Sequence, residues 1–484
     1  MPQTTRDIIN AIATDNREIL SKMLHDLIKE HEAKEGHRTR KLYQRYKQTP
    51  EGVPVYEKDF ANYEKVHKKL PNDFYGDIVD LKTGYMGNEI VIEIDKRTIG
   101  EGQAEAENEF LQDFAQENNS GDLNSELIKM ASATGKMYRL LFVSGEDGEA
   151  SIMNYEPWET VVYRDASLKE PTIGMRYFAM REYDIDTAAG KDKVNTKERY
   201  RVEWYDETTV TYYREDKDGF FELDLSMPAT GKFMHTGQQP HFFDGVPIIE
   251  FMNNEESQAE PEKAIELIDA YNDIISDAVN EVEQLRMAYL WARGAGMQLD
   301  EELEEQLNQT GIWTLPSDGE IGFVGKDLGG ASEFVQAVLA EIRRNIYSFS
   351  KSIDLSNDKG GDMRVIGWQV ALLRLEMSAS VTERKFRKGY NRQFKLLTDF
   401  WKQFGKIVID PKSLSYTFTR KFPKDIDMEI DTLVKAMEVL PTETAYGLMS
   451  FIEDPVELAK KYKEDRPEMD SILKGLDDAE NELE

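Results

Sequence analysis

The stretch IDAYNDIISDAVNEVEQL, residues 268–285, decides the architecture of this chain. Its apolar side chains recur at alternating spacings of three and four residues, at Ile268, Tyr271, Ile275, Ala278, Val282 and Leu285. A seam of this kind predicts a helix that packs nearly parallel to another helix. Pro261, a residue favoured in the first turn of a helix, predicts where this helix starts. A partner helix is predicted over 331–353, where apolar residues recur at steps of four.

The segments that follow each of these two helices are polar or rich in glycine. Residues 286–330 form a compact connecting segment between the two helices, with a strand-like run at 311–315. A polar loop at 354–364 follows the second helix. A third helix is then predicted over about 365–404, with a kink near Gly389. At 1.5 Å per residue this helix is roughly 60 Å long, which is too long for a small globular domain.

The N-terminal half predicts a mixture of helices and antiparallel strands. The elements expected first are helices over 5–47, 72–87 and 105–135 and a strand over 90–94. Between 137 and 250, short runs of β-branched and aromatic residues alternate with Gly/Asp/Lys turns, which is typical of antiparallel strands. Residues 427–484 predict short helices interrupted by Pro441 and Pro455. The fold class expected is therefore α+β, mostly helical.

The composition excludes several classes of protein. The 484 residues include 92 acidic and 60 basic side chains, a net charge of −32. This charge excludes a protein that coats nucleic acid through a generally basic surface, although it leaves room for a local basic patch. The absence of cysteine excludes disulfides, thiolate catalysis, Cys-ligated zinc and iron–sulfur clusters. Because neither a signal-peptide pattern nor a membrane-spanning apolar run is present, we expect a soluble intracellular protein.

Motifs for catalysis and for metal binding are incomplete. Residues 134–136 (TGK) resemble the end of a phosphate-binding loop, but Met130 stands where that motif needs glycine, so we predict a helix-to-strand turn. The spacing of His31 and His37 does not fit the zinc-protease motif. The acidic run 425–431 lacks calcium-loop spacing, and no serine has the glycine pattern of a nucleophile elbow. We expect neither an enzyme nor a bound metal ion or cofactor.

One basic run stands against the acidic background. Residues 381–395 contain one acid, Glu383, and six bases: Arg384, Lys385, Arg387, Lys388, Arg392 and Lys395. Such a run is either a solvated or salt-bridged helix face or a surface that contacts phosphate or an acidic neighbour. The segment that contains the helix at 268–285 is strongly acidic by contrast, since residues 255–310 contain 15 acids and three bases.

Blocks spread along nearly the whole chain resemble one known family. The blocks are LIKEH (27–31) with KLYQRY (41–46), DIVDLKTGY (77–85), VPIIEFMNNEE (246–256) with LIDAYN (267–272), DLSND (354–358) with Gly360 and Gly361, ERKFRKG (383–389), and FTRKFP (418–423) with FIEDP (451–455). In this order they are similar to the portal proteins of tailed bacteriophages, in particular those of long-tailed phages of Gram-positive bacteria. Residues 364–368 depart from the family pattern, because they lack the small residues often found after its tunnel loop.

The resemblance implies a portal fold, in which long helices surround a central channel. Its implied parts are a wing (1–256 and 365–426), a stem of two helices (257–285 and 331–353), a clip (286–330), a tunnel loop (354–364) and a crown (427–484). It also implies tunnel-loop and channel residues, namely Lys351, Asp354, Ser356, Asn357, Lys359, Gly360, Gly361 and Arg364, and stem residues that line the channel, namely Arg343 and Arg344. Of these, Lys359 and Arg364 are expected to lie nearest to DNA.

The function that the resemblance implies is that of a ring, usually of twelve copies, at one capsid vertex, through which double-stranded DNA is packaged and ejected. Implied partners are the DNA, the terminase large subunit, the head–tail adaptor, and the scaffolding and major capsid proteins, with no membrane. The implied location is the virion, after assembly in the bacterial cytoplasm. Acidic walls suit such a conduit, because repulsion from phosphate keeps DNA from sticking.

Within a ring, the run 384–395 is expected to face acidic neighbours of an adjacent subunit rather than DNA. Two other classes of protein remain open on the sequence alone. One is a non-portal structural or scaffolding protein of a phage head, and the other is an acidic metal-dependent nuclease.

Overall fold

The chain divides into two compact units, residues 1–420 and 421–484. The computed structural model describes residues 16–57, 68–86, 90–94, 101–144, 148–164, 170–186, 193–225, 237–286, 289–293, 320–324, 329–355, 365–420, 433, 436–437 and 441–447. In the second unit the described element is helix α12 (Thr442–Gly447). All the other elements below belong to the first unit.

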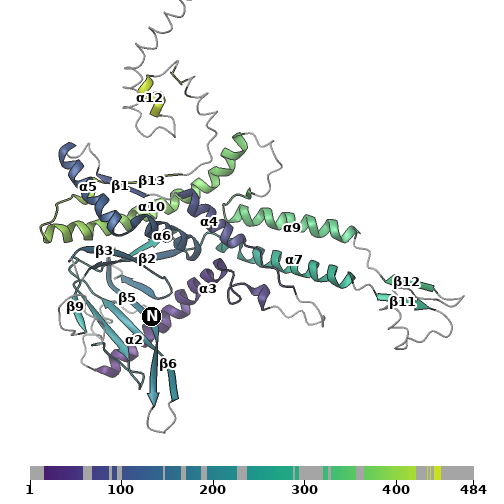
Figure 1. The fold of residues 1–484 in the computed structure, drawn as a ribbon, viewed down its shortest axis with the longest axis horizontal. Helices are drawn as coiled ribbons and strands as arrows, with labels where there is room; N and C mark the ends of the chain where they lie inside the picture. Colours follow the sequence, from purple (N-terminus) through teal and green to yellow (C-terminus); the bar gives the residue numbers. More distant parts are fainter. Residues whose placement is uncertain are drawn as a thin grey trace, which may run out of the picture. The chain divides into compact units, whose positions relative to one another are not determined.

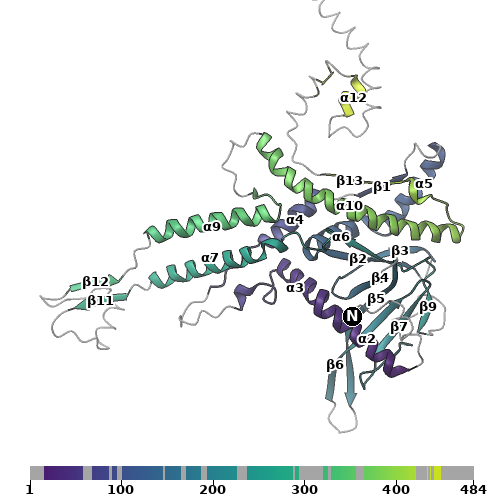
Figure 2. The ribbon, with the colours of Figure 1, turned by 180° about the vertical axis from the view of Figure 1, so that it is seen from behind.

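The N-terminal helices pack on a sheet. Helix α2 (Arg17–His31) starts at Asn16, whose side chain accepts hydrogen bonds from the free backbone N–H groups of the first turn. A π-helical turn, η1 (Glu32–Gly36), joins it to α3 (His37–Tyr46). The helix predicted over 5–47 is therefore confirmed from residue 17 onward, with one π-helical turn inside it. Figure 2 shows α2 beside the larger sheet, which it contacts through Leu24, Leu27 and Ile28.

The antiparallel strands predicted between 137 and 250 are confirmed and form two sheets. The smaller sheet has the order β10–β2–β3, with bounds Ile248–Met252, Lys136–Val143 and Ala150–Tyr155. The larger sheet has the order β4–β5–β6–β7–β8, with bounds Thr160–Arg164, Pro171–Asp186, Lys193–Tyr205, Thr209–Glu215 and Phe221–Leu223. A sixth strand, β9 (Gln238–Pro240), also pairs with β7.

Gly135 connects α6 (Ser120–Thr134) to β2. Its φ of +94° lies in the left-handed region that favours glycine. A Cβ at this position would lie 1.9 Å from the carbonyl oxygen of Ser257, so a side chain is also excluded by the neighbouring backbone. The helix-to-strand turn predicted at 134–136 is confirmed, and its glycine permits close approach of the segment that leads into α7.

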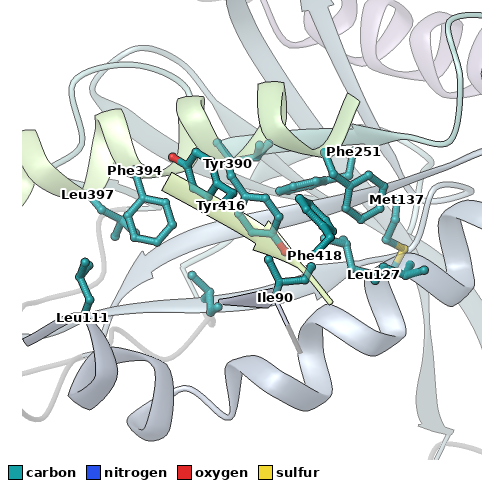
Figure 3. Packing of buried hydrophobic residues seen from close by; sticks show 14 of the residues in the cluster. Ile90, Leu111, Leu127, Met137, Phe251, Tyr390, Phe394, Leu397, Tyr416 and Phe418 are labelled. Atoms are coloured by element: carbon teal, nitrogen blue, oxygen red, sulfur yellow. The ribbon is translucent and has the colours of Figure 1, made fainter. Parts of the chain in front are cut away.

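The largest hydrophobic core lies around helix α10 (Val365–Gln403). It includes side chains from α5 (Glu101–Glu117), α6, and the antiparallel pair of strands β1 (Ile90–Ile94) and β13 (Leu414–Phe418), the latter entered through the 3₁₀ turn η5 (Pro411–Ser413). Figure 3 shows Tyr390 and Phe394 of α10 beside Tyr416 and Phe418 of β13; the rings of Tyr390 and Tyr416 are stacked, and the other ring pairs are tilted. Because β1 and β13 are far apart in sequence, this core joins segments from distant parts of the chain.

Gly389 lies inside α10, which is helical through all of its 39 residues, and the kink predicted near this glycine stays a prediction. A Cβ at Gly389 would lie 2.6 Å from the ring of Phe251. The glycine therefore allows α10 to pack closely on β10. The long helix predicted over 365–404 is confirmed.

Two long helices form a hairpin (Figure 1). Helix α7 (Ile265–Arg286) follows the 3₁₀ turn η3 (Glu262–Ala264) and lies beside α9 (Gly329–Phe349). At the base of the hairpin lie α4 (Phe74–Met86) and the 3₁₀ turn η2 (Pro54–Tyr56), and at its other end β11 (Tyr289–Arg293) pairs with β12 (Glu320–Val324).

The hairpin differs from its prediction in two details, and a third predicted feature lies outside the described residues. Pro261 precedes the 3₁₀ turn η3 and is not in the first turn of α7 itself. The second helix ends at Phe349, four residues before the predicted end at 353. The strand predicted at 311–315 lies outside the described residues.

Candidate functional site at the base of the helical hairpin

The seam predicted on α7 packs against α9. Ile268 is buried, and both Ile268 and Tyr271 belong to a cluster that includes Ile342 and Ile346 of α9. Phe74 of α4 lies edge-on to Tyr271, with ring centroids 4.9 Å apart. Ile275 and Ala278 are half-buried, whereas the side chains of Val282 and Leu285 lie outside the described part of the chain. The prediction of a helical partner is confirmed at the base of the hairpin.

A second face of α7 is polar and binds an extended segment, residues 68–72, which we call the strap. The backbone N–H groups of Asn72, Leu70 and Lys68 donate to side-chain oxygens of Asn272, Ser276 and Asn280 at 2.9, 3.0 and 2.9 Å. The spacing works because two extended residues rise about 6.6 Å and four helical residues about 6.0 Å. Sequence reasoning missed this face, although three polar residues at steps of four on a packed helix are a signal for it.

A buried polar cluster fixes the segment that leads into α7. The Nζ of Lys82 on α4 donates to Glu260 (2.5 Å), Asn253 (2.8 Å), Thr382 (2.8 Å) and Ser378 (3.2 Å). Burial opposes ionisation of Glu260, but the charge of Lys82 and hydrogen bonds from its neighbours hold the pKa of Glu260 below its ordinary value. These five residues, the Lys82 cluster, join α4, residues 253–260 and α10 into one joint.

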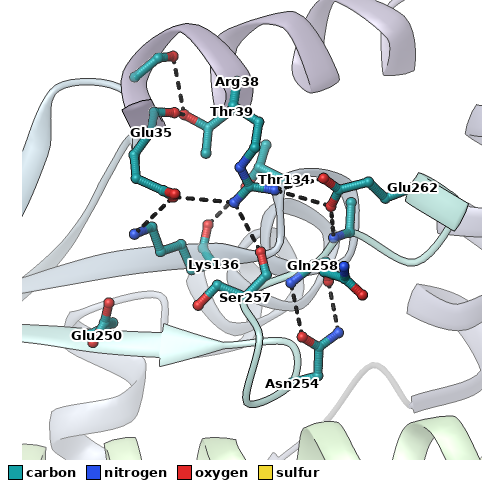
Figure 4. Close-up of polar contacts among 12 residues, drawn as sticks. Glu35, Arg38, Thr39, Thr134, Lys136, Glu250, Asn254, Ser257, Gln258 and Glu262 are labelled. Carbon is teal, nitrogen blue, oxygen red and sulfur yellow. Dashed lines mark hydrogen bonds and ion pairs between the residues drawn. The ribbon is translucent and has the colours of Figure 1, made fainter. Parts of the chain in front are cut away.

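A second set of ionic contacts holds the same segment from the other side (Figure 4). Arg38 of α3 donates to both carboxylate oxygens of Glu262, at 2.9 and 3.0 Å, and to the backbone oxygen of Ser257. Glu35 pairs with Arg38 and with Lys136 at 3.2 Å each. Burial disfavours the charge on Glu35, yet these two cations lower its pKa. The base of the hairpin is thus bound to α3, α4 and α10 at once.

Three of the predicted channel residues that fall in described segments, Arg343, Arg344 and Asp354, lie along a groove. Arg343 donates to both carboxylate oxygens of Asp354 at 2.6 and 2.9 Å. These hydrogen bonds raise the pKa of Arg343 above its ordinary value, against the effect of burial. Arg344 is exposed and pairs with Glu341. The groove, of about 780 Å³, is lined by these residues and by Tyr347, Ser348, Ser352 and Arg374.

Lys351 is exposed and has a φ of +55°, which turns the chain away from α9. Six other predicted residues lie outside the described part of the chain: Ser356, Asn357, Lys359, Gly360, Gly361 and Arg364. The structure therefore brings together Arg343, Arg344 and Asp354 along the groove. The remainder of the predicted loop stays a prediction.

Most of the basic run on α10 pairs with carboxylates of the same chain. The pairs are Lys385 with Glu255, Arg387 with Glu383, and both Arg392 and Lys395 with Glu170. A hydrogen bond from Lys395 and the charge of Arg392 lower the pKa of Glu170. Arg384 and Lys388 are exposed on one face of the helix. The interpretation as a salt-bridged face is confirmed for the four paired bases.

The described residues contain no group of three or more His, Asp or Glu side chains placed to hold a metal ion. Among the same residues, no helix is long and apolar enough to cross a bilayer.

These features define an α+β protein with a helical hairpin that is anchored at its base by buried polar contacts. A family model described as "Phage portal protein, SPP1 Gp6-like" matches residues 25–471. The portal protein of Bacillus phage SPP1 is 24% identical over 409 residues, which are 83% of this chain and 76% of that protein. The portal protein of Clostridium phage phiCD119 is 22% identical over 425 residues, which are 86% of this chain and 88% of that protein.

The chain belongs to the SPP1 Gp6-like family of phage portal proteins, whose role is structural and serves DNA packaging. The resemblance inferred from the sequence blocks is therefore confirmed. Both relatives come from phages of Gram-positive bacteria, as the sequence predicted.

Proposed function

We propose that twelve copies of this portal protein form a closed ring at one capsid vertex, and that the α7–α9 hairpins line its channel. The observation that carries the proposal is the anchoring of the hairpin base by the Lys82 cluster and by Arg38. A closed ring repeats one heterologous contact around an axis, so each hairpin must keep one fixed angle to its body. Buried charge-assisted hydrogen bonds from three separate elements supply that rigidity.

In this proposal the parts are those that the resemblance implies. The wing consists of 1–256 and 365–426, the stem of 257–285 and 331–353, and the clip of 286–330, with the tunnel loop at 354–364 and the crown at 427–484. The partners are double-stranded DNA, the terminase large subunit, the head–tail adaptor, and the scaffolding and major capsid proteins. Assembly takes place in the bacterial cytoplasm, and the ring ends in the virion.

Electron microscopy of the purified full chain tests the ring directly. We expect rings with an axial channel, and class averages that show twelve-fold symmetry. Compact monomers or dimers over a wide range of protein concentration would overturn the proposal. A ring of another subunit number would correct the stoichiometry alone.

The same proposal places Lys359 and Arg364 nearest to DNA. Arg343 makes a weaker DNA contact than these, because its guanidinium is already bound by Asp354. Reversing both charges (Lys359→Glu with Arg364→Glu) should lower the packaging rate or the packaged length while rings still form. The matched control reverses Lys412, a base in the 3₁₀ turn η5 remote from this loop in sequence. If the double variant and the Lys412 control both package DNA as wild type does, Lys359 and Arg364 do not contact the DNA.

A further inference from the structure

A cavity in the core of the first unit is remote from the hairpin. It lies between β1, α5, α6 and α10 and has a volume of about 300 Å³, roughly ten times the share of one water molecule in the liquid. Figure 3 shows Ile90, Leu111, Tyr390 and Phe394, which come from three of these elements, turned toward the same space. Its apolar wall is made by Ile90, Ile92, Leu111, Phe114, Ile152 and Phe394.

Among the described residues that line this cavity, Arg139 of β2 is the single cation, and it is only 1% exposed. Its Nε donates to Asn154 at 3.1 Å and its Nη1 to Gln393 at 3.3 Å, while its guanidinium lies 5.5 Å from the ring centre of Phe251. Its Nη2 is buried and has no hydrogen-bond partner within ordinary geometry among the described residues. Burial lowers the pKa of Arg139, and the nearby Tyr390 hydroxyl offsets part of that effect. Within the described part of the chain, Arg139 makes no ion pair with a carboxylate.

An arginine in this position is costly to the fold. The guanidinium does not lose its proton in a protein, so it cannot escape burial by becoming neutral. A buried charge that lacks a counter-ion costs several kcal/mol even after the surroundings relax. Neutral dipoles and one aromatic face offset only part of that cost. A charged residue kept beside a cavity under these conditions indicates an anionic occupant.

We propose that this cavity binds a small monocarboxylate whose charged group meets Arg139 and whose apolar body contacts the apolar wall. The lining provides one positive charge, which suits a monoanion. Glu93, the one carboxylate among the described lining residues, is exposed and repels a second negative charge on a ligand. Asn124 and Gln393 offer amide groups beside the carboxylate position. The inference does not depend on the portal function.

Calorimetry and thermal unfolding of the full chain with hexanoate test the proposal. We expect saturable binding and a rise of the unfolding midpoint with hexanoate concentration, because a ligand that binds the folded state stabilises it by mass action. Sodium chloride at equal ionic strength should raise the midpoint much less. Inorganic phosphate, a dianion at neutral pH with no apolar body, should bind at least tenfold more weakly than hexanoate.

Two variants remove binding by independent routes. Arg139→Met removes the cation, and Ala115→Phe fills the cavity from α5 while Arg139 stays in place. Each should weaken hexanoate binding at least tenfold, and either variant decides the outcome if the other fails to fold. Arg164→Met is the matched control, because Arg164 pairs with Glu250 and is not part of the cavity lining. This variant should bind hexanoate as wild type does.

Three results would overturn the proposal. The first is a hexanoate effect no larger than that of sodium chloride. The second is unchanged hexanoate binding in both folded cavity variants, which would place the ligand elsewhere. The third is phosphate binding that is tighter than hexanoate binding, which would mean that the cavity selects charge and not a carboxylate with an apolar body.

Discussion

Lys82 and Arg139 are two cations of the same unit, each 1% exposed, that the fold treats differently. Lys82 has a carboxylate partner at 2.5 Å and three further oxygen partners. Arg139 has amide oxygens and an aromatic face, and one of its terminal nitrogens is unpaired. The charge of Lys82 is neutralised by Glu260, whereas in the proposal above the charge of Arg139 is neutralised by a bound ligand.

The difference follows from what each site has to do. The Lys82 cluster joins three segments that lie up to 300 residues apart, so every donor is used to fix one geometry. Arg139 is held by neutral amide groups and has no carboxylate partner among the described residues, and the cavity beside it has room for a ligand. The fully paired Lys82 therefore fixes a joint between segments, whereas Arg139, with a cavity beside it, is available to a ligand.

The largest effect is expected when the paired charge is broken. Lys82→Met leaves the carboxylate of Glu260, whose side chain is only 8% exposed, without its cation. Removal of one member of a buried pair costs about 3–5 kcal/mol of unfolding free energy. Urea unfolding at fixed protein concentration measures this loss. Fewer intact rings should also form, because the angle of the hairpin is no longer fixed.

The double variant Lys82→Met with Glu260→Gln is the control for this prediction. It removes both charges but keeps an amide that can bind Ser378 and Asn253, so it should recover a large part of the lost stability. A double variant as unstable as Lys82→Met would show that lost packing, and not the unpaired carboxylate, causes the effect.

His31 represents a third way to bury a base, which is to keep it neutral. Its Nδ1 lies 2.7 Å from the hydroxyl of Tyr177, and Nε2 is buried with no partner. Burial, helped by the charge of Lys136 and opposed by Glu35, lowers its pKa from 6.5 to about 4. The unfolded chain therefore binds a proton that the folded chain resists. The contribution of His31 to the free energy of unfolding is therefore fully present above pH 6.5 and is lost as the pH falls toward 4.

This titration predicts a difference between wild type and His31→Gln. Between pH 7 and pH 4.5 wild type should lose about 2.5 kcal/mol more unfolding free energy than the variant, which has no imidazole to protonate. Urea unfolding of both proteins at the two pH values measures the difference, and the carboxylates of the chain contribute equally to both. If wild type and variant lose the same unfolding free energy, burial does not disfavour the protonated form of His31 in the folded protein.

Local patterns in the sequence predicted much of the fold, whereas partners distant in sequence could not be predicted. The seam beginning at Ile268 and Tyr271 and the antiparallel strands were found because their periodicity lies within one element. Lys82 belongs to a block that could be matched to a family, but nothing local says that its charge meets Glu260 and Thr382. Arg343 was predicted to line a channel, and its bond to Asp354 was missed because it depends on how the chain turns after α9.

The smallest effect is expected at the polar face of α7, which contrasts with the apolar seam on the same helix. Ser276→Ala leaves the backbone N–H of Leu70 without an acceptor, because the serine Oγ accepts from it at 3.0 Å. An unpaired buried donor costs on the order of 1 kcal/mol. Ser350→Ala is the matched control: its hydroxyl is equally buried but donates only to carbonyls of its own helix, which keep their backbone partners. Urea unfolding should show the larger loss in Ser276→Ala, and amide exchange at Leu70 should speed up in that variant alone. If both variants lose the same stability and Leu70 stays protected, the strap is held by packing and its hydrogen bonds to α7 contribute nothing measurable.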